Sequence, residues 1–318
     1  MVTPAWAAGA GSRTIDLAGP VHYVDMGGPV GGPLLVGVHG LGGSHLNWAA
    51  VGPALTRHSR VLALDLVGHG LTPAGGRTPD IEGHRTLLSD FLRSVGASPA
   101  ILVGNSMGGL VAALQAVAEP ESVAGLILID PALPTSRPGF VHPRVIANFL
   151  LCAVPGLGQR YLTERRRRTT AEQTVRRVLE VCCVDATRVS PEVVDAHVEL
   201  TARVDRSLAD AAYLRSARSL SLMMANPGDT MRRLDDLHQP TLLLHGARDL
   251  LVPLSAARRM SAAHSGWRFE VAPETGHVPM LEAPGWTTSV IEDWMAAEGV
   301  AAVRHSSTAP YAGADTVS

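Results

Sequence analysis

The sequence contains no lysine, because all 27 basic residues among its 318 are arginines. This absence excludes an enzyme that binds its substrate or cofactor as a lysine Schiff base, and it excludes a P-loop, which requires a lysine. The arginines are balanced by 29 acidic residues, so the net charge is only −2. A nucleic-acid-binding protein is expected to show a basic excess, and we therefore expect no nucleic-acid partner.

Cysteine is also scarce, and the chain contains only Cys152, Cys182 and Cys183. Their number and spacing exclude a disulfide framework and a zinc site. Residues 1–13 lack the charged and apolar regions of a secretory signal, and no apolar run reaches the roughly 18 residues of a membrane span. These absences predict reduced thiols, a cytoplasmic location and no membrane contact.

Short apolar runs recur along most of the chain and predict buried strands. Most of them are continuously apolar, which is the pattern of a sheet covered on both faces. The run Val21–Asp25 alternates instead, which favours an edge strand. The other predicted strands are Leu34–Val38, Val61–Leu64, Ile101–Val103, Leu126–Ile129, Thr241–Leu244 and Phe269–Val271.

The segments between these runs have the periodicity of helices. Alternating strands and helices predict an α/β fold with a doubly wound, mostly parallel sheet. A hydrophobic content of 46% is sufficient for a large core. The predicted helices are Trp48–Thr56, Ile81–Val95, Met107–Ala118, Ser255–Ala263 and Trp286–Ala297.

The alternation is interrupted at residues 133–237, where no strand is expected. About a hundred residues are long for a loop, so this segment is predicted to form a helical subdomain that lies over the sheet. The core then comprises residues 13–132 and 238–299, with flexible tails at 1–12 and 300–318. The helices predicted in the subdomain are Pro143–Val154, Thr170–Cys182, Pro191–Val204 and Ser207–Leu222.

The most specific motif is Gly104-Asn-Ser106-Met-Gly108, which follows a predicted buried strand and precedes a predicted helix. In this context Gly-x-Ser-x-Gly indicates a strained turn that exposes the serine hydroxyl above the sheet, with glycines where a Cβ would clash. The Met107 N–H at the start of the helix lies at the positive end of the helix dipole and suits an oxyanion. Ser106 is therefore the candidate nucleophile.

A serine hydroxyl needs a base, and the base needs an acid to orient it. His277 follows the last predicted strand, so it lies at the same edge of the sheet as Ser106. Asp249, after Thr241–Leu244, is the favoured acid. Asp130 is its rival because it also ends a strand, although Pro131 gives it a turn-forming role, and Asp65 is a weaker third candidate. His22, His58, His84, His142 and His197 are interpreted as surface or packing residues.

The motif His39-Gly-Leu41-Gly-Gly offers a second oxyanion donor, for which the Leu41 N–H is the best candidate. Glycines on both sides of Leu41 allow the backbone to approach a substrate oxygen closely. The His39 ring is interpreted as a hydrogen-bonding partner of neighbouring loops, with no role in catalysis.

Five blocks in this order carry a resemblance to the α/β-hydrolase superfamily across residues 20–297. The resemblance implies a sheet of about eight strands with a cap after the sixth strand, and the chain order Ser, Asp, His. It also implies Ser106 as nucleophile, Asp249 as acid, His277 as base, and the Leu41 and Met107 N–H groups as oxyanion hole. The blocks are VHGLGGS (38–44), DLVGHG (65–70), GNSMGG (104–109), HGARD (245–249) and GHVPMLE (276–282).

The resemblance is less specific about the reaction, because this fold hosts many chemistries. Haloalkane dehalogenases and epoxide hydrolases use an aspartate nucleophile, where this chain has Ser106. Meta-cleavage-product hydrolases, which break carbon–carbon bonds, are similar at GNSMGG but usually have tryptophan where this chain has Val278. Cofactor-free haloperoxidases share the serine triad. A non-catalytic binding protein is a further alternative, against which the intact triad positions argue.

The expected activity is hydrolysis of a carboxylic ester, esterase- or lipase-like, through an acyl-enzyme and without a metal or organic cofactor. The run Arg165–Arg168 lies near Glu164 and Glu172 and is interpreted as a solvated helix end of mixed charge. Apolar, adaptable residues in the subdomain predict a small-molecule ester with an apolar acyl group. These residues are Phe140, Phe149, Leu150, Leu151, Met223 and Met224.

Overall fold

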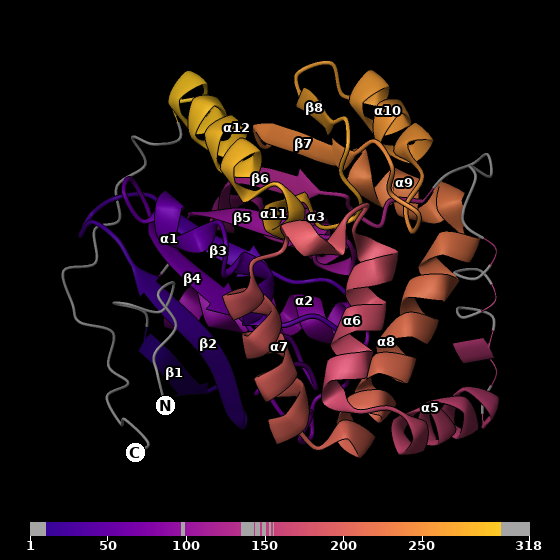
Figure 1. Cartoon of the computed structure of the whole chain (residues 1–318). Helices are drawn as coiled ribbons and strands as arrows, with labels where there is room; N and C mark the ends of the chain where they lie inside the picture. Colours follow the sequence, from indigo (N-terminus) through magenta and orange to yellow (C-terminus); the bar gives the residue numbers. More distant parts are fainter. Residues whose placement is uncertain are drawn as a thin grey trace.

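The computed structural model describes residues 11–96, 99–134 and 156–299, together with residues 143, 147, 151, 152 and 154. Eight strands form one sheet in the order β1-β2-β4-β3-β5-β6-β7-β8 (Figure 1). The β1–β2 and β2–β4 pairs are antiparallel and the remaining pairs are parallel, which confirms the mostly parallel sheet. The strands are β1 (Gly11–Asp16), β2 (Pro20–Gly27), β3 (Leu34–Val38), β4 (Arg60–Leu64), β5 (Ala100–Asn105), β6 (Val123–Ile129), β7 (Thr241–Gly246) and β8 (Arg268–Ala272).

The edge position predicted for Val21–Asp25 is wrong, because β2 pairs on both sides. The edge strand on this side of the sheet is β1, which begins at Gly11 and pairs Ser12 with Val24. Gly11 and Ser12 therefore belong to the sheet and not to the predicted tail. The sequence of β1 is polar and mostly exposed, so it has no apolar alternation by which it could have been detected.

Helices cover both faces of the sheet, as the continuously apolar strands require. One face, with Val36 and Leu102, packs beneath α2 and α3, and the other, with Leu35 and Ile101, packs beneath α1 and α12. The core helices are α1 (Gly52–Leu55), α2 (Ile81–Ser94), α3 (Met107–Ala118), α10 (Leu254–Ala263), α11 (Pro279–Glu282) and α12 (Pro284–Ala297).

One predicted core helix is divided in two. The segment Trp48–Thr56 contains the end of a short 3-10 helix, η2 (His45–Trp48), and the separate helix α1. Pro53 stands in the first turn of α1 and has no N–H to donate to a preceding turn. A helix can therefore begin at this proline but cannot continue through it.

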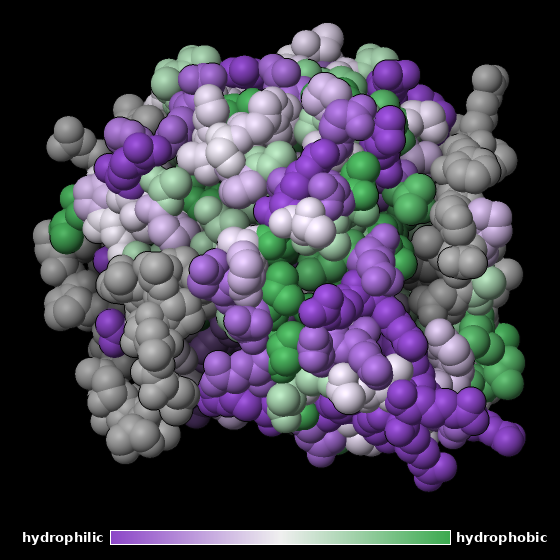
Figure 2. Space-filling view, in the orientation of Figure 1, coloured by the Kyte–Doolittle hydropathy of each residue, from purple (hydrophilic) through white to green (hydrophobic). Residues whose placement is uncertain are grey.

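Between β6 and β7 every described element is a helix, as predicted for residues 133–237. Most of the predicted helix Pro143–Val154 lies outside the described residues. Figure 2 shows a strip of apolar surface between α6 and α7. None of the described helices is both long enough and apolar enough to span a membrane. The helices of this insertion are α5 (Leu157–Arg168), α6 (Ala171–Cys182), η4 (Ala186–Arg188), α7 (Pro191–Arg203), α8 (Arg206–Ala225) and α9 (Pro227–Leu234).

The insertion is attached to the core through α8. The buried ring of His84 in α2 lies 3.0 Å from Ser216 Oγ, and Ser219 Oγ accepts the Ile81 N–H at the start of α2. A Cβ on Gly42, in the loop after β3, would lie 3.3 Å from the ring of Tyr213. The helical insertion is thus placed over loops at the carboxyl ends of the strands.

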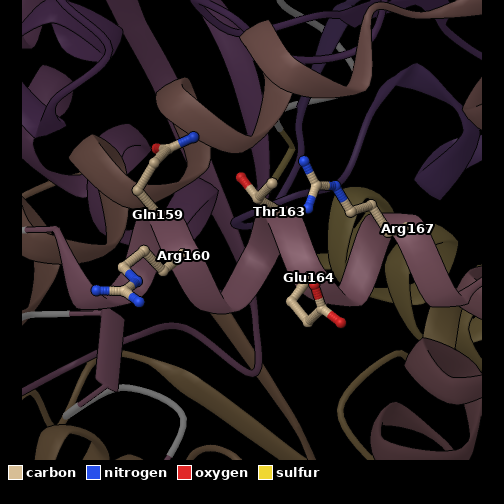
Figure 3. A pocket seen from close by; sticks show the side chains of 5 residues that line it. All are labelled: Gln159, Arg160, Thr163, Glu164 and Arg167. Carbon is tan, nitrogen blue, oxygen red and sulfur yellow. The ribbon is translucent and has the colours of Figure 1, made fainter.

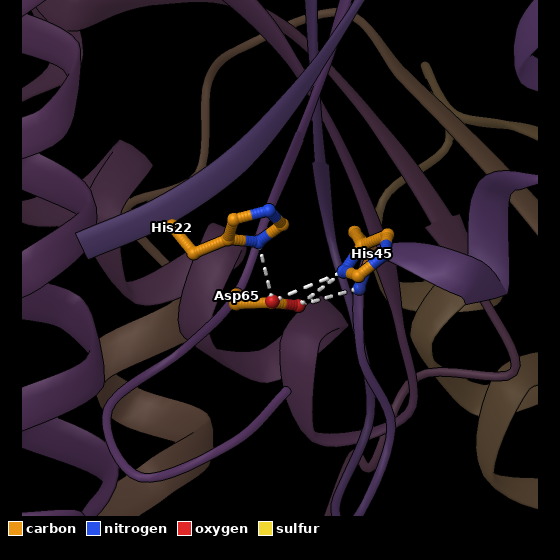
Figure 4. Close-up of side chains that lie close together, drawn as sticks. All are labelled: His22, His45 and Asp65. Atoms are coloured by element: carbon orange, nitrogen blue, oxygen red, sulfur yellow. Dashed lines mark hydrogen bonds and ion pairs between the residues drawn. The ribbon is translucent and has the colours of Figure 1, made fainter. Parts of the chain in front are cut away.

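Asp65, at the end of β4, holds the neighbouring loops together. Its buried carboxylate lies 2.7 Å from His22 Nδ1 and 3.0 Å from His45 Nδ1 (Figure 4), and it accepts the N–H groups of His45 and Leu71. Burial would raise the pKa of Asp65, but the two histidines lower it far below its usual range. The third acid candidate is therefore part of a structural network.

Three further histidines, His39, His69 and His84, form a buried row in which neighbouring ring centroids lie 5.4 Å apart. Burial lowers the pKa of each ring, and that of His39 falls from 6.5 to about 3. His39 Nε2 accepts the N–H of Leu66, so this ring is neutral and holds a loop, as predicted. The unfolded chain binds protons on these rings at a higher pH than the folded chain does.

The free energy of unfolding is therefore expected to fall as the pH decreases below 6.5, toward the pKa of about 3 at His39. His69→Leu should reduce this pH dependence by up to one proton, or at most about 1.4 kcal/mol per pH unit, when urea unfolding is measured from about pH 6 to pH 5. The exposed His58 supplies the control, since His58→Leu should retain the full slope. Equal slopes in the two variants would contradict the assignment of the buried row.

Candidate active site

Ser106 occupies the turn between β5 and α3 with φ 54° and ψ −120°. A non-glycine residue rarely adopts this conformation, which costs about 1–3 kcal/mol and must be held by its surroundings. The Ser106 N–H donates to the Ile129 carbonyl at 3.0 Å, and the Ser106 carbonyl accepts the Ala132 N–H at 2.9 Å. The end of β6 thus holds the strained turn predicted from Gly-x-Ser-x-Gly.

Close backbone approaches explain the glycines around Ser106. A Cβ on Gly108 would lie 2.1 Å from the Val38 carbonyl oxygen, so no larger residue fits there. A Cβ on Gly40 would lie 3.0 Å from Ser106 Cβ. The loop after β3 therefore passes directly against the serine.

The N–H groups of Leu41 and Met107 flank this point. Leu41 follows Gly40, and Met107 is the first residue of α3, where N–H groups have no partner within the helix. Neither N–H donates a hydrogen bond to another described residue. Two unpaired backbone donors near one hydroxyl have the chemistry of an oxyanion hole.

His277 and Asp249, predicted as base and acid, are brought together. His277 Nδ1 lies 2.7 Å from Asp249 Oδ2, and both side chains are almost fully buried. Asp249 Oδ1 accepts the N–H groups of Leu251 and Val252 at 2.7 and 3.1 Å. Burial would raise the pKa of Asp249, but His277 and the backbone donors lower it below its usual value. The carboxylate is therefore ionised and fixes the imidazole with its proton on Nδ1.

The rival acid, Asp130, forms no hydrogen bond with His277 among the described residues. Its Oδ1 accepts the N–H of Gly246. Asp249 is the carboxylate that orients His277 in this structure.

Ser106 and His277 are connected through Asn105. The side-chain amide of Asn105 donates to the carbonyl oxygens of His277 and Ile129, each at 3.1 Å. The residue preceding the serine thus holds the histidine loop at the end of β6. Ser106 Oγ and His277 Nε2 have no hydrogen-bond partner among the described residues, and such contacts often form only when substrate binds.

The helical insertion also holds the histidine loop. The carbonyl oxygen of Cys182, the last residue of α6, accepts the His277 N–H at 2.6 Å. The buried carboxylate of Glu282 in α11 accepts the Gly276 N–H and the Asp185 N–H, each at 2.8 Å. One carboxylate therefore joins the loop of His277 to the insertion. Nothing in the sequence except the proximity of Glu282 to His277 indicated this contact.

Glu282→Gln is expected to lower the free energy of unfolding by about 1–3 kcal/mol. A glutamine has one acceptor oxygen, so either the Gly276 or the Asp185 N–H is left buried without a partner. Urea unfolding measures the loss. Glu274→Gln is the matched control, because Glu274 is exposed in the same loop and its carboxylate pairs with the exposed Arg248. The contact has no importance for stability if the two variants are equally stable.

Two groups of buried side chains include ligand types that metals use: His22, His45 and Asp65, and Asp130, His245 and Asp249. In the first group both carboxylate oxygens already accept hydrogen bonds from histidine rings and backbone N–H groups. The second group includes the carboxylate that orients His277. We therefore assign neither group to a metal.

The cysteine thiols are not suited to act as nucleophiles. Burial raises the pKa of the Cys152, Cys182 and Cys183 thiols, and that of Cys183 reaches about 12. A thiol with so high a pKa is a poor nucleophile. All three are free cysteines, as predicted.

A cavity of about 460 Å³ lies along α5 and is lined by Gln159, Arg160, Thr163, Glu164 and Arg167 (Figure 3). It shares no residue with the site around Ser106. In the run Arg165–Arg168, Arg166 pairs with Asp210 and Arg168 pairs with Glu164. This helix end is thus of mixed charge, as predicted.

Of the apolar residues predicted to contact substrate, Phe140, Phe149 and Leu150 lie outside the residues whose side chains are described. Met223 and Met224, in α8, are partly buried against the core, as is Leu41. Leu41 also packs against a small cluster within the insertion that contains Leu162 and Leu214. Apolar side chains of the insertion therefore cover the loop beside Ser106.

Known proteins are similar to this chain in sequence and in fold. The model of the alpha/beta hydrolase family matches residues 35–290. A pimeloyl-[acyl-carrier protein] methyl ester esterase from Aromatoleum aromaticum is 30% identical over 284 residues, which cover 82% of this chain and 97% of the esterase. A 2-hydroxy-6-oxo-2,4-heptadienoate hydrolase from Pseudomonas putida is 27% identical over 282 residues, which cover 87% of this chain and 92% of the hydrolase.

Similarity to solved structures extends to more distant sequences. The crystal structure of a haloalkane dehalogenase from Agrobacterium tumefaciens has a TM-score of 0.78 at 17% identity, with 92% of this chain and 98% of the dehalogenase covered. At this identity the likeness concerns the fold alone. The family match and the sheet with its helical insertion lead to one conclusion: the chain belongs to the alpha/beta hydrolase family.

Proposed function

We propose that this protein is a serine hydrolase that cleaves carboxylic esters with an apolar acyl group. Ser106 is the nucleophile, His277 the base and Asp249 the acid that orients it. The observation that carries the proposal is the 2.7 Å contact between His277 Nδ1 and Asp249, on a loop that Asn105 ties to the strained turn of Ser106. The relative that acts on a methyl ester supports the same chemistry.

In the proposed reaction His277 Nε2 takes the Ser106 proton as Oγ attacks the ester carbonyl. The Leu41 and Met107 N–H groups stabilise the oxyanion, and each such donor is typically worth about 3–4 kcal/mol in the transition state. The tetrahedral intermediate collapses, and the alcohol leaves with the proton from His277. Water, deprotonated by His277, then attacks the acyl-serine and releases the carboxylic acid.

We propose residues 133–237 as a cap over this site and residues 13–132 with 238–299 as the catalytic core. The contacts of Tyr213 with the Gly42 loop and of Cys182 with His277 support this division. The cap then determines the acyl group through its apolar side chains, including Met223 and Met224.

Hydrolysis of p-nitrophenyl esters of increasing acyl length tests the proposal. We expect release of p-nitrophenol with a preference beyond acetate, and covalent labelling by a fluorophosphonate probe at Ser106. A folded protein that is neither labelled nor active would favour a binding protein on this fold. Activity on acetate alone would contradict the apolar acyl group while leaving the ester chemistry intact.

The relative named a 2-hydroxy-6-oxo-2,4-heptadienoate hydrolase makes carbon–carbon bond hydrolysis the second candidate. Val278 follows His277 here and is buried among aliphatic side chains, where hydrolases of the meta-cleavage-product type usually have tryptophan. We therefore expect the ester series to be hydrolysed faster than a 2-hydroxy-6-oxo-dienoate. The reverse order would replace the ester assignment with this one.

A further inference from the structure

Asp130 lies at the end of β6, beside the His277–Asp249 pair, and no step of the proposed reaction uses it. It is fully buried, with φ 45°, a conformation that non-glycine residues rarely adopt. Its N–H donates to the Leu244 carbonyl and its Oδ1 accepts the Gly246 N–H, each at 2.9 Å. The side chain is therefore held firmly against β7.

The second carboxyl oxygen of Asp130 has no hydrogen-bond partner among the described residues, although it is buried. An oxygen of Asp130, an oxygen of Asp249 and a ring nitrogen of His245 lie within 4.8 Å of one another. Two carboxylates this close and shielded from water do not both ionise, because each charge disfavours the other. One of the two therefore carries a proton.

The hydrogen bonds around Asp130 and Asp249 show which of the two carboxyl groups carries the proton. Asp249 accepts from His277 and from the N–H groups of Leu251 and Val252, whereas within the described part of the chain Asp130 accepts from Gly246 alone. Burial, and then the charge of Asp249, raise the pKa of Asp130 well above its usual range. Asp249 is thus the anion and Asp130 the neutral acid.

The proton of Asp130 has two neighbouring acceptors. His245 Nε2 lies 3.1 Å from the Val252 carbonyl, so Nε2 carries the ring proton and Nδ1 is bare. This Nδ1 lies 3.5 Å from Asp130 Oδ1, which is long for a hydrogen bond. Burial lowers the pKa of His245, so its ring stays neutral. The Asp249 carboxylate is the stronger acceptor because it is charged.

We propose that Asp130 is a neutral carboxylic acid that donates a hydrogen bond to the Asp249 carboxylate and thereby acts as a positioning residue of the triad. This inference rests on the proposed function. The bond holds the Asp249 carboxylate in place and moderates the negative charge that the imidazolium meets. The titratable groups around Asp130 are Asp249, His245, Glu282 and the thiol of Cys182 in α6.

Asp130→Asn and Asp130→Leu test the inference through the pH profile of kcat/KM. Asparagine can accept from Gly246 with its oxygen and donate to Asp249 with its amide, so this variant should stay within about threefold of the native rate with an unchanged acid limb. Leucine removes the donor, which leaves Asp249 more basic. The kcat of Asp130→Leu should fall about tenfold with KM nearly constant. The acid limb of its kcat/KM profile should move to higher pH by about 0.5–1 pH unit.

An ionised Asp130 would give the opposite pattern. Removing a negative charge near His277 would then move the acid limb to lower pH in both variants, and this result would overturn the inference. A loss in Asp130→Asn as large as that in Asp249→Asn would also overturn it. An unchanged profile in Asp130→Leu would show that Asp130 positions nothing.

Infrared difference spectra provide a readout that does not depend on activity or on the folding of the leucine variant. At neutral pH the native protein should show the C=O stretching band of a protonated buried carboxyl, and Asp130→Asn should lack it. Absence of this band from the native protein would refute the neutral acid. If the native protein hydrolyses no ester, the proposed function fails, while the infrared comparison still decides the protonation of Asp130.

Discussion

Ser106→Ala is expected to lower kcat for ester hydrolysis by about 10⁴- to 10⁶-fold, with little change in KM. The hydroxyl supplies the only bond to the acyl group in the proposed mechanism, so its loss leaves only the binding site and the oxyanion hole. The burst of p-nitrophenol and the labelling by a fluorophosphonate probe should disappear with it. Stopped-flow kinetics and mass spectrometry of the labelled protein measure both effects.

The fold should survive this change, because the Ser106 backbone N–H and carbonyl hold the turn and the side-chain oxygen has no partner among the described residues. Thermal unfolding of the variant checks this point. Ser255→Ala, on the exposed surface of α10, is the matched control and should keep the native rate. More than about one hundredth of the native activity in Ser106→Ala would remove the serine from its proposed role.

The sequence predicted these residues because each lies within a few residues of the end of a strand. Ser106 follows β5, Asp249 lies shortly after β7 and His277 after β8, and parallel strands bring their carboxyl ends to the same edge of a sheet. Apolar runs located the strands, so the meeting of His277 with Asp249 could be predicted without coordinates. The catalytic roles themselves stay predictions until the variants are measured.

The contacts that hold the site were not predictable in the same way. Glu282 accepts the N–H of Gly276 and, across 97 residues of sequence, the N–H of Asp185, and backbone N–H groups have no signature in the side chains. The Asp65 network was also missed, since His22 comes from β2 and His45 from η2, and His22 resembled an ordinary packing histidine. Hydrogen bonds to the backbone depend on loop geometry, and apolar periodicity contains no information about loop geometry.

The choice between Asp249 and Asp130 shows where sequence reasoning reaches its limit. Both acids follow adjacent strands, β7 and β6, and both are buried at the same edge of the sheet. The difference lies in the donors that surround each carboxylate. Asp249 accepts hydrogen bonds from the His277 ring and from the N–H groups of Leu251 and Val252. These donors are positioned around Asp249 only by the fold of the turn from Asp249 to Val252.

Asp249→Asn is therefore expected to lower kcat about 10⁴-fold near neutral pH. The N–H groups of Leu251 and Val252 both point at Oδ1, so the amide oxygen of asparagine must take that place and its NH₂ group must face His277. Nδ1 of His277 then has to accept a hydrogen bond from this NH₂ group, and the ring proton moves to Nε2. An imidazole with its proton on Nε2 cannot remove the proton of Ser106.

Asp130→Asn is the matched comparison, because the same chemical change is made on the neighbouring strand. There the amide oxygen takes the Gly246 N–H and the NH₂ group reproduces the neutral acid, so the rate should remain near native. A ratio of about 10³ or more between the two variants, measured as kcat on one ester, would assign the charge to Asp249. The reverse ratio would assign the charge to Asp130. The 2.7 Å contact between His277 Nδ1 and Asp249 would then describe a resting arrangement that the reaction does not use.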